Sequence, residues 1–166
     1  KISDKFEEKM NRIFEYVGIW ADKFIISKYH DKLNDEQKTY VNVALSSFAE
    51  FMFEYHKLTP DKWNIQATRE CLLYTIPKRL SIEDEFFYEL NIKKEKFFKF
   101  AAQEELLNNA ENISNMIKNI KSQIIENSLN PEYWGESKRF AMDNFFNDTN
   151  FDIDDNINSE DDENIL

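Results

Sequence analysis

The chain has 166 residues, of which 42% are hydrophobic and 15% aromatic, with only two glycines and three prolines. This apolar content excludes a wholly disordered chain, and the length suits one domain with a sizeable core. The scarcity of Gly and Pro excludes most sheet architectures, which need turn residues between short strands. The net charge of −11 argues against non-specific binding of DNA or RNA.

The negative charge is concentrated at the C-terminal end. Nine acids and no lysine or arginine lie between residue 143 and the end, so residues 1–142 carry 21 bases against 23 acids. We therefore divide the chain into a nearly neutral helical domain, residues 1–146, and an acidic tail, residues 147–166.

The chain has a single cysteine, Cys71, which excludes an intramolecular disulfide and a cysteine cluster for zinc. No apolar run approaches the ~18 residues of a membrane span. We therefore expect a cytoplasmic protein that does not bind a membrane. The chain begins at Lys1 rather than Met, which is compatible with a removed leader or an upstream domain.

The first predicted helix has the clearest apolar pattern. Six apolar residues recur at alternating spacings of four and three: Phe6, Met10, Ile13, Val17, Trp20 and Phe24. Ser3 is the expected N-cap, and Gly18 lies off this stripe, so the helix continues through it. Four further apolar residues widen the apolar face, which favours packing in a bundle over a two-stranded coiled coil: Phe14, Ile19, Ile25 and Ile26.

The later apolar patterns predict further helices. A second helix begins at Asp35, and a third follows Pro60 and ends near Pro77, because proline disfavours helix in the residue before it. A fourth begins at a variant capping box on Ser81 and reaches a break near Asn91. The last helices are expected over residues 97–107 and 113–124, and through Phe140 and Phe145. With no convincing strand, the sequence predicts an all-α, compact bundle of about six or seven helices with an acidic C-terminal tail.

Two stretches share one order of residue types: LTPDKW at 58–63 and LNPEYW at 129–134. In each, the residue before proline suits the N-cap and proline suits the first helical position. The leucine and tryptophan are then placed to pack together as a hydrophobic staple. Because the flanking sequences match poorly, convergent helix-start chemistry explains the pair better than a duplicated domain.

No residue pattern typical of catalysis or metal binding is present. His30 and His56 lack the glutamate three residues earlier that a di-iron bundle requires, and no phosphate-binding glycine loop is found. Cys71 is the one candidate nucleophile, but it lies on an apolar helix face and is expected to be a buried structural thiol. We therefore expect no enzyme, and no catalytic, cofactor-binding or metal-binding residue.

Two basic stretches are candidates for contact with a partner. Residues 93–100 alternate lysine and phenylalanine, as nucleic-acid surfaces can, but helical spacing turns Phe97 and Phe100 inward and the lysines outward. Lys78 and Arg79 are expected on an exposed connection, facing an acidic partner or the chain's own tail. We therefore expect a protein partner rather than nucleic acid.

The stretch NPEYWGESKRF, residues 130–140, has one residue that a helix start does not require, Gly135. It is expected either to admit another chain segment or to bend the turn. The tail places isolated apolar residues among acids, which is typical of segments that fold on docking. The candidate interaction residues are therefore Lys78, Arg79, Trp134, Gly135, Lys138 and Arg139, with Phe151, Ile153, Ile165 and Leu166 in the tail.

Three segments carry a family resemblance: FAEFMFEYHKLTPDKW (48–63), CLLYTIPKRLSIEDEFF (71–87) and NPEYWGESK (130–138). With them, residues 46–142 resemble a family of uncharacterised bacterial all-helical proteins. Some resembling proteins also carry a zinc-binding SEC-C segment, which is absent here because Cys71 alone cannot supply it. The resemblance implies a helical fold and no particular activity.

These features favour a non-catalytic adaptor or regulatory module that uses its acidic tail as a docking segment. The alternative is an acidic nucleic-acid mimic, whose tail carboxylates imitate phosphates and occupy the basic cleft of a DNA-binding protein. A tail that only keeps the protein soluble is the simplest interpretation of its charge.

Overall fold

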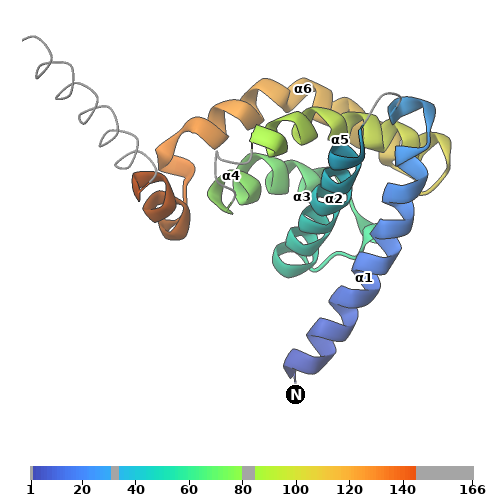
Figure 1. Ribbon diagram of the computed structural model, residues 1–166, viewed down its shortest axis with the longest axis horizontal. Helices are drawn as coiled ribbons and strands as arrows, with labels where there is room; N and C mark the ends of the chain where they lie inside the picture. The colour runs from blue at the N-terminus through green and yellow to red at the C-terminus, as the bar shows by residue number, and fades with distance from the viewer. Residues whose placement is uncertain (1, 31–33, 80–84, 145–166) are drawn as a thin grey trace, which may run out of the picture.

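The computed structural model describes residues 2–30, 34–79 and 85–144, and within these ranges every regular element is helical (Figure 1). The elements are α1 (Ile2–Ile25), η1 (Lys28–His30), α2 (Asp35–His56), η2 (Pro60–Lys62), α3 (Ile65–Glu70), η3 (Cys71–Thr75), α4 (Ile76–Arg79), α5 (Glu85–Gln103), α6 (Ala110–Leu129) and η4 (Pro131–Tyr133). A last helix covers residues 136–144. The all-α prediction is confirmed, while the Ser81 capping box and the acidic tail lie outside the described residues.

Two pairs of long helices make up most of the bundle. The most extensive contacts join α1 to α2 and α5 to α6, and the partners run in opposite directions (Figure 1). The shorter segment formed by α3, η3 and α4 packs against α6 and α2. No helix within the described ranges is long and apolar enough to cross a membrane.

The predicted stripe on α1 forms part of the core. Five of its six residues are buried: Met10, Ile13, Val17, Trp20 and Phe24. Phe6 is 39% exposed, near the free end of the helix. The helix passes through Gly18 as predicted, but Ser3 is not its N-cap, because α1 already includes Ile2.

Trp63 contacts three long helices. Its side chain is 1% exposed, and its ring lies 5.8 Å from Trp20 of α1, 4.8 Å from Phe48 of α2 and 6.1 Å from Phe98 of α5, measured between centroids. All three contacts are edge-to-face, the geometry that the charge distribution of aromatic rings favours. Asn109, just before α6, donates a hydrogen bond to the Trp63 carbonyl at 3.0 Å. Trp63 therefore ties both helix pairs together.

The fourth and fifth predicted helices are one helix. The backbone of α5 runs from Glu85 to Gln103, so the predicted break at Asn91 is wrong. The helix also ends before Leu107, because the chain reverses at Glu105, whose φ is 55°. The intrinsic preference of one asparagine is a weak one, and tertiary context can outweigh it.

Two charged residues of α5 are buried, against the prediction that its lysines lie outside. Lys96 and Lys99 are exposed as predicted, but Lys94 is 4% exposed and its amine lies 5.5 Å from the centre of the Phe48 ring. Burial lowers the pKa of Lys94 to about 8 and raises that of Cys71 to about 12, although each moderates the shift of the other.

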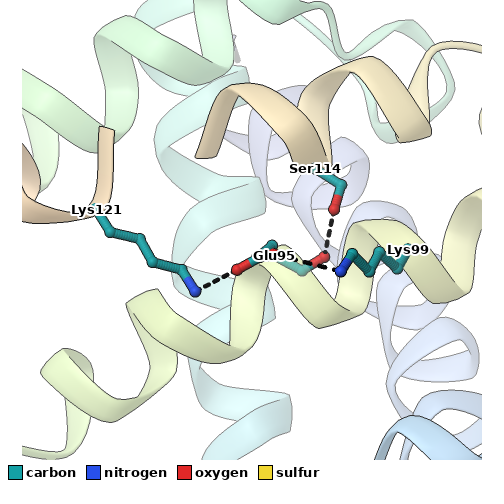
Figure 2. A network of polar contacts seen from close by, with 4 residues as sticks. All are labelled: Glu95, Lys99, Ser114 and Lys121. Carbon is teal, nitrogen blue, oxygen red and sulfur yellow. Dashed lines mark hydrogen bonds and ion pairs between the residues drawn. The ribbon is translucent and has the colours of Figure 1, made fainter. Parts of the chain in front are cut away.

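The second buried charge, Glu95, joins α5 to α6 (Figure 2). Its carboxylate pairs with Lys121 of α6 and, at 3.4 Å, with Lys99 of its own helix. Ser114 of α6 donates a hydrogen bond to the Glu95 carbonyl at 2.9 Å. Burial alone would raise the pKa of Glu95, but the two lysines outweigh it and lower the pKa. The α5–α6 pair is therefore held by polar contacts as well as by apolar packing.

Replacing Trp63 by alanine removes the ring that three helices share. We expect Trp63→Ala to lower the free energy of unfolding by about 3–5 kcal/mol, the range for large buried aromatics. Trp134 is only partly buried, so Trp134→Ala is expected to lower it by less. Urea denaturation of both variants checks the order, and equal losses would contradict the role assigned to Trp63.

The buried lysine makes stability depend on pH in a narrow window. Between pH 8 and 9 the folded chain releases the Lys94 proton while the unfolded chain, with a pKa of 10.5, keeps it. The free energy of unfolding therefore rises with pH, by at most about 1.4 kcal/mol per unit for one lysine. Above pH 9 the Cys71 thiol, which ionises at 9.0 when unfolded, opposes this rise.

Lys94→Met keeps most of the side-chain volume and removes the titration. Lys138, whose pKa burial also lowers to about 8, contributes in the same direction, so the slope should fall by roughly half rather than vanish. Urea denaturation at steps between pH 8 and 9 measures the slope. The exposed Lys118→Met is the control, and an unchanged slope in Lys94→Met would refute the assignment.

Candidate functional site

The helix that begins at Ile65 does not stop before Pro77. Residues Glu70, Cys71 and Ile76 all have right-handed helical dihedral angles, so α3, η3 and α4 form one continuous helix ending at Arg79. The predicted end near Pro77 is therefore wrong. At its N-terminus the Asn64 side chain accepts a hydrogen bond from the Ala67 N–H at 2.8 Å.

This helix accommodates Pro77 with help from α6. In η3 the Ile76 N–H bonds to the Cys71 carbonyl, five residues earlier, which is the pattern of a π turn. Pro77 has no N–H to donate to the preceding turn. The Leu73 carbonyl, four residues before Pro77, instead accepts a hydrogen bond at 2.9 Å from the amide of Asn127, which is 4% exposed. The Asn127 side chain of α6 thus supplies the donor that proline lacks.

The carbonyls at the end of α4 receive donors from residues 135–138. The Gly135 N–H donates to the Lys78 carbonyl at 3.0 Å, and the Lys138 amine donates to the Pro77 carbonyl at 2.6 Å. The same amine lies 3.3 Å from the Ser128 carbonyl, near the end of α6. Lys138 therefore joins the C-terminal ends of two helices, where a positive charge is favourable.

The stretch NPEYWGESKRF begins with a short 3-10 turn rather than with an α-helix. The Asn130 side chain accepts from the Glu132 N–H at 3.1 Å, and η4 ends after three residues. Trp134 is extended, and the next helix starts beyond Gly135, whose carbonyl accepts from the Arg139 N–H at 3.0 Å. The predicted N-cap at Asn130 and the proline at the first helical position are confirmed, but the helix that they start is a 3-10 turn of three residues.

The stretch LTPDKW has the same course as LNPEYW. Pro60–Lys62 form η2, Trp63 is extended, and α3 begins at Ile65. Thr59 makes no side-chain cap and instead donates to the Asp61 carboxylate at 2.6 Å. The similarity of the two stretches persists in the structure, as a proline-started 3-10 turn followed by an extended tryptophan.

The two tryptophans are held differently. Leu58 is partly buried against the core that encloses Trp63, whereas Leu129 is 52% exposed. Trp134 is fixed by polar contacts: its indole N–H donates to the Ser128 carbonyl at 2.9 Å, and the Lys138 amine lies 5.1 Å from its ring centre.

These contacts bring two basic pairs, some 60 positions apart in the sequence, to one cavity of about 670 Å³. Its lining consists of Lys78, Arg79, Trp134, Gly135, Glu136, Ser137, Lys138 and Arg139. We call this cavity the basic groove. It contains all six candidate interaction residues that the structure describes, while the other four candidates, Phe151, Ile153, Ile165 and Leu166, lie outside the described residues.

The four cations of the basic groove have different roles. Lys78, Arg79 and Arg139 are exposed, whereas Lys138 is 4% exposed and is used to join the helix ends. The Arg79 guanidinium lies 5.1 Å from the centre of the Tyr55 ring, and Arg139 donates to two nearby carbonyls. Within residues 2–30, 34–79 and 85–144, none of these cations is paired with a carboxylate.

Gly135 allows the two halves of the basic groove to approach each other. A Cβ atom on this residue would lie 3.2 Å from both the carbonyl oxygen and the Cγ of Lys78. These distances are tighter than ordinary van der Waals contact, and one partner is backbone. Of the two expected roles for Gly135, the close approach of another chain segment is confirmed.

Asn127 and Ser128 support the site but were not identified from the sequence. Both are buried on α6. The Asn127 amide bonds to Leu73 and the Ser128 carbonyl to Trp134, and no local motif encodes either contact. Their only sequence signal is a pair of small polar residues near a helix end.

The two other residues considered for chemistry, Cys71 and His56, both lie in helices. Cys71 is 0% exposed, and its raised pKa keeps the thiol protonated at neutral pH, so the prediction of a buried thiol is confirmed. His56 is the last residue of α2, with Nδ1 3.9 Å from a Glu70 carboxylate oxygen. The described residues contain no group of three or more His, Cys, Asp or Glu side chains that could hold a metal ion.

Comparison with known protein families, with curated proteins and with solved structures finds no match to the chain. The resemblance to a bacterial helical family therefore stays a prediction.

Lys138→Met should separate the two helix ends. A lysine amine, charged or neutral, has N–H groups for both carbonyls, and methionine has none, so the buried Pro77 carbonyl loses its donor. We expect the free energy of unfolding to fall by about 1–3 kcal/mol. Thermal or urea denaturation measures the loss, with the exposed Lys118→Met as the control, and equal stability of the two variants would contradict this role.

Proposed function

We propose that this protein is a non-catalytic helical adaptor or regulatory module whose basic groove binds a short acidic segment of a protein partner. One observation carries the proposal: Lys78–Arg79 and Lys138–Arg139, from α4 and from the last helix, line one cavity beside Trp134. We place the protein in the cytoplasm as part of this proposal, because its lone thiol needs no oxidising compartment.

The basic groove has the chemistry to recognise carboxylates. Arginine presents a planar fork of donors that fits a carboxylate in a bidentate manner, and Arg79 and Arg139 are both exposed. The Tyr55 ring under Arg79, and the carbonyls bonded to Arg139, restrain both side chains before a partner arrives. The N-terminus of the last helix adds further positive potential.

The size of the basic groove favours a peptide over a larger anionic surface. A volume of about 670 Å³ accommodates a few side chains, and the partly buried Trp134 offers them an apolar wall. Nucleic acid would need a longer positive track than the four cations of this cavity provide. A short segment that mixes acids with isolated apolar residues fits best.

The nucleic-acid mimic makes a different prediction. A mimic would use the carboxylates of residues 147–166, which lie outside the described ranges, and its binding would not depend on the basic groove. Sensitivity of partner binding to Lys78 and Arg79 therefore separates the two functions.

Binding of a synthetic peptide to the full chain tests the proposal. The probe is a short fluorescein-labelled peptide of Asp, Glu, Phe and Ile, followed by fluorescence anisotropy. We expect the double variant Lys78→Glu/Arg79→Glu to bind at least about tenfold more weakly than the wild type, because two attractive charges become repulsive. Added salt should weaken the wild-type complex.

Two controls make the result specific. Lys5→Glu/Lys118→Glu changes two exposed lysines outside the groove and alters the net charge equally, so it should retain wild-type affinity. A peptide with Asn and Gln in place of the acids should not bind. Equal affinities of the two double variants would refute the proposal.

A further inference from the structure

We infer that the acidic tail of the same chain, residues 147–166, occupies the basic groove when no partner is bound, so that a partner must displace it. This inference rests on the proposed function, since it names the regulation of the same groove. It adds that the chain's own tail limits the fraction of molecules whose groove is free to bind a partner.

Charge complementarity is the first argument. The tail carries eight acids and no base, while the exposed cations of the groove, Lys78, Arg79 and Arg139, have no carboxylate partner within the described chain. Three cations elsewhere do have such partners, since Arg12 pairs with Glu8, and Lys99 and Lys121 pair with Glu95.

Proximity in the chain is the second argument. The helix over residues 136–144 supplies four residues to the lining of the groove, and the tail begins three residues after residue 144. An extended chain spans roughly 3.3–3.6 Å per residue, so a 20-residue tail is long enough to return over this helix. A short tether of this kind gives an effective concentration in the millimolar range, at which even a weak contact is occupied.

The sequence of the tail suits the walls of the groove. In the run FDIDD, residues 151–155, apolar and acidic residues alternate. In an extended conformation, Phe151 and Ile153 would point to one side and Asp152 and Asp154 to the other. One side can then lie on Trp134 while the carboxylates meet Arg79 and Arg139.

A tail bound in this way lowers the affinity for any partner that uses the groove. The apparent dissociation constant rises by the reciprocal of the fraction of molecules whose groove is empty. Changes that weaken the tail contact should therefore strengthen partner binding.

The test compares the labelled acidic peptide on three full-length chains. In the tail variant, Asp152→Asn/Asp154→Asn/Asp155→Asn neutralises three tail carboxylates. In the control variant, Asp22→Asn/Glu50→Gln/Glu126→Gln neutralises three exposed carboxylates of the helical domain. We expect the tail variant to bind the peptide about tenfold more tightly than the wild type, and the control to match the wild type.

Two comparisons show whether the gain arises at the groove. Adding Lys78→Glu/Arg79→Glu to the tail variant should abolish the tighter binding, because the groove then attracts neither tail nor peptide. Equal affinities of the wild type and the tail variant, with binding still lost on reversal of the groove charges, would overturn this inference and leave the proposed function standing. Absence of peptide binding to every chain would overturn both.

Carbodiimide cross-linking distinguishes the same chain from a second copy. The reagent joins an amine to a carboxylate in contact with it, and mass spectrometry identifies the pair. We expect links from Lys78 to tail acids within monomers. Links found only in dimers would overturn the assignment to the same chain and make the occupant the tail of another copy.

Discussion

The carbonyl groups around a proline inside a helix need donors, and the position of the basic groove follows from how they obtain them. The three carbonyls of Leu73, Pro77 and Lys78 accept from Asn127, Lys138 and Gly135, respectively. Since unpaired buried carbonyls cost more than a typical hydrogen bond contributes, these donors hold α6 and residues 130–139 against α4. The basic side chains meet there as a consequence.

The parts of the fold that depend on local periodicity could be predicted from the sequence. The spacing from Met10 to Phe24 identified the buried face of α1, and the apolar neighbours of Cys71 indicated its burial. The helix that passes through Pro77 could not be predicted, because the rule for proline is local and the compensating donor, Asn127, is 50 positions away. The burial of Lys94 could not be predicted for a similar reason, since it depends on helices that pack over α5.

The sequence identified the individual residues of the candidate site, but it did not predict that they lie together. Lys78 and Arg79 were selected for their exposure, and Gly135 for having no role in a helix start. Their meeting depends on a close backbone approach that no motif encodes. The prediction for Lys138 was incomplete. Its amine donates to two backbone carbonyls, and the same amine lies against the ring of Trp134. In the proposed function, the other three cations of the basic groove are therefore the ones left to contact a partner.

The π turn at Cys71–Thr75 determines the direction in which the last two side chains of α4 point. A π turn contains one residue more than the α-helical turn it replaces, and one residue corresponds to about 100° of rotation around the helix axis. With an ordinary α-helical turn at this point, the same sequence would place Lys78 and Arg79 about 100° further around the helix axis. The size of one helical turn, which ends three residues before Lys78, therefore sets which way the cations at the end of α4 face.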